Sequence, residues 1–324
     1  MPEETKITRR QTFAIAAAAP LVAAAPGLTQ AAAPMMGPST AVHHRFKLGA
    51  FEVTTVFEGA ITIDGPHPIF GQDQEAADVQ ALAKQNFLPP TRMEIGFTPV
   101  VVNTGREVVL FDAGNGVARR EVGAGQLRAR LADAGFAPEQ IDVVVITHMH
   151  PDHIVGLTED GAPAFPNARY VTTAAEYDFW SNPDRMSGGT ERVAKLVQEH
   201  VVPKADKFSF IGFGDDVVSG VTAIDGSGHT PGHTVYNIES DGQRLVLFAD
   251  LTNHYVASLQ RPEWHVRFDM DKEKAGATRR RILDMIAADR VPSAGYHMPF
   301  PAVGYVEKVG DGFRWVPASY QLRV

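Results

Sequence analysis

The sequence predicts an α+β fold in which two mixed β-sheets lie face to face between outer helices. Two observations predict it: strand-like apolar runs occur in two groups along the chain, and helix-like segments follow each group. A third observation is that histidines and aspartates follow several of these runs directly. Because the loops of two stacked sheets meet at one edge, we expect ligands to collect there.

Short β-branched or alternating apolar runs predict the strands. The expected strands are residues 46–48, 51–57, 61–63, 99–103, 107–111, 141–146, 169–172, 208–211, 221–224, 235–239, 244–249, 304–309 and 313–316. Short turns at residues 104–106, 240–243 and 310–312 predict hairpins, the second of them through an Asp-Gly pair. The apolar run 141–146 reads as a buried strand.

Apolar residues at helical spacing predict the helices. The expected helices are residues 75–86, 126–134, 173–180, 192–201 and 272–288. Gly135 is a plausible C-terminal cap for the second helix. Thr172 or Thr173 begins the third, and Glu176 three residues later is typical of a capping box.

The composition is that of an ordinary globular protein: 324 residues, 44% of them hydrophobic and 21% charged. Lys and Arg number 30 against 38 Asp and Glu, which gives a formal net charge of −8. Without a basic run after the N-terminus we expect no nucleic-acid partner, which counts against a nuclease. The chain has no cysteine, so it can form no disulfide, and any metal must be held by His, Asp, Glu or water.

Residues 1–33 differ in kind from the rest of the chain. A polar segment ends in Arg9 and Arg10, and an apolar, alanine-rich stretch follows over residues 13–25. This pattern predicts a signal peptide, and the paired arginines resemble a twin-arginine export signal. A membrane anchor is the alternative, but it would need about 20 apolar residues. We expect residues 34–324 to form one periplasmic domain, with no membrane contact after cleavage.

The densest group of potential metal ligands follows the buried strand 141–146. Four lie within six residues: His148, His150, Asp152 and His153. If the strand continued to His150, its alternation would place the two nearest histidines on one face. Pro151 would then force a turn that brings the other two ligands beside them.

Three further candidates lie in the second half of the chain. His229 lies in a Gly-His-Thr-Pro-Gly-His loop between two strands, Asp250 is the first charge at the end of an apolar strand, and His297 follows a short apolar segment. Taken alone, each would be an ordinary turn, cap or surface residue. Together with the first cluster they supply seven candidate ligands.

The order of these motifs resembles the metallo-β-lactamase superfamily. The resemblance implies the metallo-β-lactamase fold, an αββα sandwich with two divalent metal ions at the edge between the sheets. It implies one ion on His148, His150 and His229, a second on Asp152, His153 and His297, and Asp250 as a bridge between them. Asp112, in an Asp-x-Gly position, would lie behind a ligand histidine and orient it.

Within this superfamily the chain looks most like methyl parathion hydrolase and related periplasmic organophosphate hydrolases. The resemblance covers residues 44–320 and includes the segments 178–180, 228–234 and 297–301. The expected pocket for an apolar substrate includes three residues: Trp180, His254 and Phe300. The loops 115–125 and 187–196 depart from that family because they lack its aromatic residues, so we expect these loops to decide the substrate.

The resemblance implies a hydrolase in which a metal-bridging hydroxide attacks a neutral ester, lactone or phosphotriester, a small-molecule substrate. Asp250 and Asp152 would be the catalytic carboxylates. Zinc is expected first, with manganese, cobalt or iron as alternatives, because His and carboxylate ligands accept all four. A β-lactamase and an iron-dependent oxidoreductase of the same fold remain as alternatives. A homodimer is compatible with the sequence, which leaves the oligomeric state open.

Overall fold

The computed structural model describes residues 35, 37 and 39–320. The chain divides into two units, Met1–Thr40 and Ala41–Val324, and the fold below is that of the second unit. The predicted signal peptide, residues 1–33, lies outside the described residues. Among the described residues, no helix combines the length and the apolar character that a membrane crossing requires.

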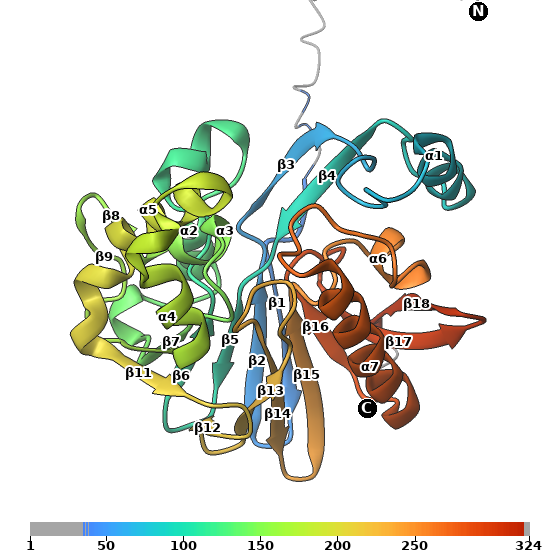
Figure 1. The fold of residues 1–324 in the computed structure, drawn as a ribbon. Helices are drawn as coiled ribbons and strands as arrows, with labels where there is room; N and C mark the ends of the chain where they lie inside the picture. The colour runs from blue at the N-terminus through green and yellow to red at the C-terminus, as the bar shows by residue number, and fades with distance from the viewer. Residues whose placement is uncertain (1–34, 36, 38, 321–324) are drawn as a thin grey trace, which may run out of the picture. The chain divides into compact units, whose positions relative to one another are not determined.

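Two seven-stranded sheets form the centre of the second unit (Figure 1). The first contains, in spatial order, β1 (His43–Leu48), β2 (Phe51–Val56), β5 (Val100–Asn103), β6 (Val108–Phe111), β7 (Val143–Val145), β10 (Arg169–Thr173) and β11 (Phe208–Ile211). The second contains β12 (Asp216–Val218), β13 (Val221–Asp225), β14 (Thr234–Ser240), β15 (Gln243–Ala249), β16 (Ser293–Gly295), β17 (Val303–Val309) and β18 (Gly312–Pro317). Both sheets are mixed, because β6, β7, β10 and β11 pair in parallel and so do β15 and β16.

Two small sheets accompany the main pair. They are formed by β3 (Gly59–Asp64) with β4 (Arg92–Phe97), and by β8 (Thr158–Glu159) with β9 (Ala162–Pro163). The α-helices are α1 (Ala76–Gln85), α2 (Leu127–Asp133), α3 (Pro151–Ile154), α4 (Ala174–Ser181), α5 (Glu191–His200), α6 (Ala257–Gln260) and α7 (Lys272–Asp289). Short 3-10 helices include η1 (Val117–Val122) and η5 (Gly188–Thr190).

Three apolar layers hold the sheets and helices together. Between the sheets, Val102 and Val143 of the first belong to one core cluster with Tyr236 and Leu247 of the second. A second cluster joins the outer face of the first sheet to α2, α4 and α5, and a third joins the second sheet to α6 and α7. Figure 1 shows α2 to α5 on one side of the sheets and α6 and α7 on the other. The predicted αββα sandwich is therefore confirmed.

The longest helix, α7, follows from capping and periodicity. Asp271 is its N-cap, and its side chain accepts a hydrogen bond from the backbone N–H of Lys274. Its buried residues recur every three or four positions and include Ile282, Leu283 and Ile286, which pack under the second sheet.

The structure differs from the prediction at the metal-ligand cluster. The strand β7 ends at Val145 and does not continue to His150. The backbone N–H of Thr147 donates to Asp112 Oδ1 at 2.9 Å, so it is not available to a strand ladder. The side chains after Val145 are therefore placed by a side-chain contact instead of by strand alternation.

Candidate metal centre

The candidate ligands meet at one edge of the two sheets. Asp112 follows β6 and His148 lies just beyond β7 in the first sheet, whereas Asp250 follows β15 and His297 lies just beyond β16 in the second. His229 lies in the loop that joins β13 to β14. Residues far apart in the sequence are thus brought together, as the prediction requires.

Three histidines of the first group point their ring nitrogens at one another. His148 Nε2 lies 3.1 Å from His150 Nδ1. His229 Nε2 lies 3.2 Å from His148 Nε2 and 2.9 Å from His150 Nδ1. Asp250 Oδ2 completes the group, 3.5 Å from His229 Nε2. All four ligand atoms lie within 4.8 Å of one another.

The chemistry of this group suits a divalent cation. Burial lowers the pKa of His150 to about 3 and the pKa of His148 well below its ordinary value. Both imidazoles are therefore neutral near pH 7, with a lone pair available on each. Converging neutral imidazole nitrogens with one carboxylate form the kind of donor set that holds zinc.

The second group shares Asp250 with the first. His297 Nε2 lies 3.1 Å from Asp250 Oδ2 and 3.5 Å from Asp152 Oδ2. His153 Nε2 lies 3.3 Å from Asp250 Oδ1, and neither of these two buried atoms has a hydrogen-bond partner among the described residues. Two adjacent donor sets that share one carboxylate are what a pair of metal ions needs.

Charge is closely balanced in the second group. Although burial opposes ionisation, the neighbouring histidines lower the pKa of Asp152 to about 2 and the pKa of Asp250 well below its ordinary value. Burial likewise opposes a charged His153, but Asp112, Asp250 and Asp152 together raise its pKa well above the ordinary value. A protonated His153 therefore accompanies the two ionised carboxylates.

Asp112 lies behind the candidate ligand His153. It is buried, and its two carboxylate oxygens accept hydrogen bonds from the backbone N–H and the hydroxyl of Thr147, both at 2.9 Å. Asp112 Oδ2 also lies 2.8 Å from His153 Nδ1. Its backbone φ of 65° is unusual for a residue other than glycine, which marks a strained turn at the end of β6.

Asp269 holds His229 from behind, and the sequence analysis did not find it. Asp269 Oδ1 lies 2.8 Å from His229 Nδ1, and Oδ2 accepts a hydrogen bond from Arg279 at 2.7 Å. Arg279 is 1% exposed and also donates to two backbone carbonyls. This buried pair fixes the ring so that its Nε2 faces the other histidines.

Glu176 was also missed as a residue of the centre. Its carboxylate accepts from the backbone N–H of Met149 at 2.8 Å, the indole of Trp180 at 2.9 Å, the hydroxyl of Thr230 at 2.8 Å and the backbone N–H of Gly232 at 2.8 Å. The Glu176 side chain therefore points into the core, not back toward the start of α4 as a capping box requires. It joins the loop of His148 and His150 to the loop of His229.

His233 supports Asp250. Its Nε2 accepts a hydrogen bond from the Asp250 backbone N–H at 3.1 Å, while its Nδ1 lies 3.0 Å from the carbonyl of Gly226. The pattern Gly-His-Thr-Pro-Gly-His contains this residue beside His229, so the repeated histidine was the signal that could have identified it. Tyr296 also holds a candidate ligand in place, because its hydroxyl donates a hydrogen bond to the backbone carbonyl of Asp152 at 2.6 Å.

The three predicted pocket residues have different surroundings. Trp180 is 2% exposed, and its ring lies 6.2 Å from His150, so it packs in the core behind a candidate ligand and does not form an open wall. His254 is half-buried, and its Nδ1 accepts from two backbone N–H groups at the start of α6. Phe300 is half-buried against Phe57, with ring centroids 5.7 Å apart.

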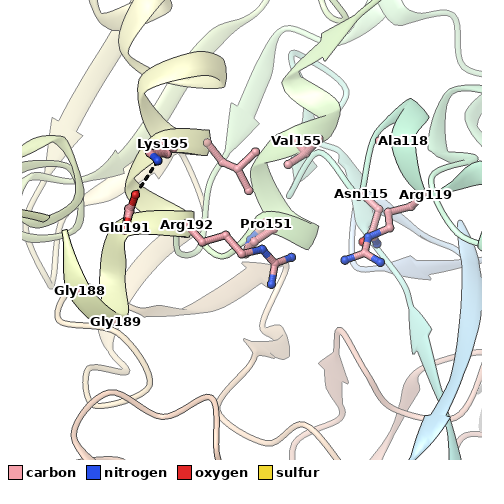
Figure 2. Close-up of a pocket in the computed structure, with 11 residues that line it drawn as sticks. Asn115, Ala118, Arg119, Pro151, Val155, Gly188, Gly189, Glu191, Arg192 and Lys195 are labelled. Carbon is pink, nitrogen blue, oxygen red and sulfur yellow. Dashed lines mark hydrogen bonds and ion pairs between the residues drawn. The ribbon is translucent and has the colours of Figure 1, made fainter. Parts of the chain in front are cut away.

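A pocket of about 570 Å³ lies beside the segment that carries the candidate ligands His150 and Asp152 (Figure 2). The two segments that depart from the resembled family line it from opposite sides (Figure 2). Asn115, Ala118 and Arg119 come from the first segment, whereas Gly188, Gly189 and residues of the first turns of α5 come from the second. Pro151, which lies between His150 and Asp152 in the chain, also lines it. The volume matches that of a small-molecule site.

Comparison with known proteins agrees with this geometry. The metallo-beta-lactamase superfamily matches residues 98–294. AidC, a dizinc quorum-quenching lactonase solved with the product N-hexanoyl-L-homoserine, is 27% identical with a TM-score of 0.79, over 86% of this chain and 98% of that chain. The hydrolase AbOPH, of the beta lactamase superfamily, is 25% identical with a TM-score of 0.78, over 87% of this chain and 99% of that chain.

A curated relative matches over a shorter segment. It is an N-acyl homoserine lactonase of a Bacillus species, 27% identical over 117 residues, which are 36% of this chain. The chain spans 40% of the length of this relative.

Proposed function

Because the chain belongs to the metallo-β-lactamase superfamily, we propose that it is a binuclear metal-dependent hydrolase that opens lactones and also cleaves aryl esters and phosphotriesters. The observation that carries the proposal is the position of Asp250, whose carboxylate is shared by two adjacent groups of candidate ligands. The similarity to AidC, a lactonase, and to the hydrolase AbOPH supports the choice of substrates. We also propose that the chain is similar to methyl parathion hydrolase and related periplasmic organophosphate hydrolases.

The proposed ions are two divalent cations. Zinc is the first choice, and manganese, cobalt and iron are the alternatives. His148, His150 and His229 would hold one ion, Asp152, His153 and His297 would hold the other, and Asp250 belongs to both groups of candidate ligands. Bound there, two divalent ions lower the pKa of a water molecule toward about 7 and polarise a carbonyl or phosphoryl oxygen, which supplies the nucleophile and the electrophilic activation.

The side chains of the centre have separate tasks. Asp250 keeps the two groups adjacent, and its low pKa keeps it ionised near neutral pH. Asp152 is the more accessible carboxylate, with 22% of its side chain exposed against 4% for Asp250, so it can pass a proton to solvent. Asp112, Asp269 and Glu176 hold the ligands in place, because each binds a ligand ring or its loop.

A substrate panel tests the proposal. Zinc-loaded protein is assayed with an acyl homoserine lactone, an aryl ester, methyl parathion and a carbapenem, and its metal content is measured alongside. We expect lactone opening to be fastest. The substitutions His150→Ala and Asp250→Asn should abolish activity and lower zinc content, and full activity in either variant would contradict the assignment.

The same panel separates the two alternatives. Carbapenem cleavage faster than lactone opening would indicate a β-lactamase. Iron as the dominant metal, with oxygen uptake, would indicate an oxidoreductase of the same fold. Export to the periplasm is also proposed, from the arginine pair and the apolar stretch before residue 34. Fractionation of expressing cells tests it, since retention in the cytoplasmic fraction would contradict export.

A further inference from the structure

The pocket beside Pro151 is lined by more cationic than anionic side chains, although the protein as a whole is acidic. Four ionisable side chains line it: Arg119, Glu191, Arg192 and Lys195. Glu191 and Lys195 form an ion pair one helical turn apart on α5, at 2.5 Å. Their charges therefore balance, whereas the chain as a whole has a formal charge of −8.

The two arginines of the pocket are unpaired. Neither the Arg119 nor the Arg192 guanidinium has an ion-pair or hydrogen-bond partner among the described residues. Figure 2 shows the two side chains reaching from opposite walls toward one another across Pro151. Arg119 belongs to η1, and Arg192 lies in the first turn of α5.

Two arginines that are close to Arg119 in the sequence have structural partners. Arg120 donates to the carbonyl of Gly125 at 3.0 Å and pairs with Glu159 at 2.5 Å. Arg128 also lies 3.9 Å from the Glu159 carboxylate. Arg119 and Arg192 differ from these two arginines, because their guanidinium N–H groups have no partner among the described residues.

A guanidinium presents several N–H donors in a planar fork that matches a carboxylate. Two such forks on opposite walls of one pocket favour a negatively charged group between them. We infer that this pocket binds a carboxylate carried by the substrate, remote from the bond that is cleaved, so that acid-bearing lactones and esters are preferred over neutral ones. The inference rests on the proposed hydrolase function.

The place of the pocket fits this role. Pro151 joins the pocket to the candidate ligands, because its chain neighbours are His150 and Asp152. A substrate whose reacting carbonyl lies at the metal centre can therefore extend a side chain into the pocket. Val155 and Leu196 also line it and would contact the apolar part of that side chain.

Matched substrates test the inference. Zinc-loaded protein is assayed with 4-nitrophenyl monoesters of linear dicarboxylic acids such as adipic acid, and with the 4-nitrophenyl esters of the monocarboxylic acids of equal length. We expect a lower KM for the anionic esters, and an advantage that falls as salt is added, because exposed charges are screened.

The variants identify the residues. The double substitution Arg119→Ala with Arg192→Ala should raise KM for the anionic esters about tenfold and leave kcat and the neutral esters unchanged. Arg106→Ala is the matched control, because the Arg106 side chain also has no ion pair within the described part of the chain. Arg106 lies in the turn before β6, whereas Asp112 follows the other end of that strand. Equal effects on anionic and neutral esters, or no effect on either, would overturn the inference.

A binding measurement keeps this result separate from the proposed function. Calorimetric titration of the zinc-loaded protein with adipate needs no catalysis, so it remains informative if no ester is hydrolysed. We expect about tenfold weaker binding in the double variant and unchanged binding in Arg106→Ala. Adipate binding that is identical in all three proteins would overturn the inference even if the esters are hydrolysed.

Discussion

Asp269 is buried, with only 3% of its surface exposed, yet its position bears directly on the candidate metal centre. Its carboxylate lies between the ring of His229 and the guanidinium of Arg279, with both contacts shorter than 3 Å. Although burial opposes it, Arg279 lowers the pKa of Asp269 to about 2. The residue is therefore ionised and increases the electron density that His229 offers to a cation.

We expect Asp269→Asn to lower zinc affinity by about tenfold or more, because the amide keeps the shape of the side chain but not its charge. Competition with a chromophoric zinc chelator measures the affinity, and circular dichroism checks that the variant is folded. Asp289→Asn is the matched control, since Asp289 only forms an exposed ion pair with Arg244. Unchanged zinc affinity in Asp269→Asn would show that the contact does not influence the ligand.

The sequence identifies the candidate ligands, and the family resemblance adds Asp112 behind one of them, but neither identifies Glu176 or Asp269. His148 and Asp250 could be predicted because they closely follow apolar strands, and His229 because its Gly-His-Thr-Pro-Gly-His loop completes the motif order of the resembled superfamily. Glu176 lies within a helix, where a charged residue ordinarily faces solvent, and nothing in its neighbours shows that the side chain is buried. Asp269 contacts a histidine 40 residues away, and that distance in sequence is bridged only by the fold.

At the scale of elements, the loop of residues 115–125 depends on one buried carboxylate. Glu58 Oε1 accepts hydrogen bonds from Asn115 N at 3.0 Å, from Asn115 Nδ2 at 2.6 Å and from Gly125 N at 3.1 Å, which ties both ends of the loop. Gly114 makes room for it, because a Cβ there would lie 1.9 Å from Glu58 Oε2. The loop that carries Arg119 is therefore held at its base.

The pKa of Glu58 makes this attachment sensitive to pH. Burial raises the pKa from 4.5 to about 7, although the hydrogen bonds from Asn115 and Gly125 oppose the increase. A raised pKa means that the folded state binds more protons than the unfolded state between these two values. The unfolding free energy therefore falls as pH rises from 4.5 through 7.

We expect Glu58→Gln to remove this dependence, since the amide oxygen can accept the same hydrogen bonds without a charge. For metal-depleted protein, the unfolding free energy of the variant minus that of the wild type should increase by about 3 kcal/mol between pH 4.5 and 7. Urea denaturation at a series of pH values measures it. A constant difference across this range would show that Glu58 does not titrate as described.

The elements themselves were predictable where a periodic pattern is long or strongly apolar. The hairpin of β14 and β15 around Asp241 and Gly242 and the helix α7 were expected from their patterns and are present. The strand β4 was missed, because residues 92–97 mix two charges with apolar residues and pair only with β3 at the margin of the fold. Such a strand depends on its partner more than on its own sequence.

At the scale of the molecule, the candidate centre joins the two sheets. His148, His150 and His153 follow strand β7 of the first sheet, whereas Asp250 and His297 follow strands of the second. The sheets already share a buried core, so the fold does not depend on the centre alone. An ion that binds residues of both sheets nevertheless binds only when they are correctly packed, so its binding free energy adds to the stability of the folded state.

Zinc should therefore raise the melting temperature of the metal-depleted protein. Free zinc at 100 times its dissociation constant adds about 2.7 kcal/mol for one site, which corresponds to a shift of about 5 °C or more for a domain of this size. Because Asp250 is shared by both ligand groups, Asp250→Asn should lose most of the shift. His265→Ala should keep it, since His265 only pairs with Glu273 at the surface. Scanning calorimetry at increasing zinc concentrations measures the melting temperatures of all three proteins. If Asp250→Asn shows the same shift in melting temperature as the wild type, this carboxylate does not couple the two sheets through a metal.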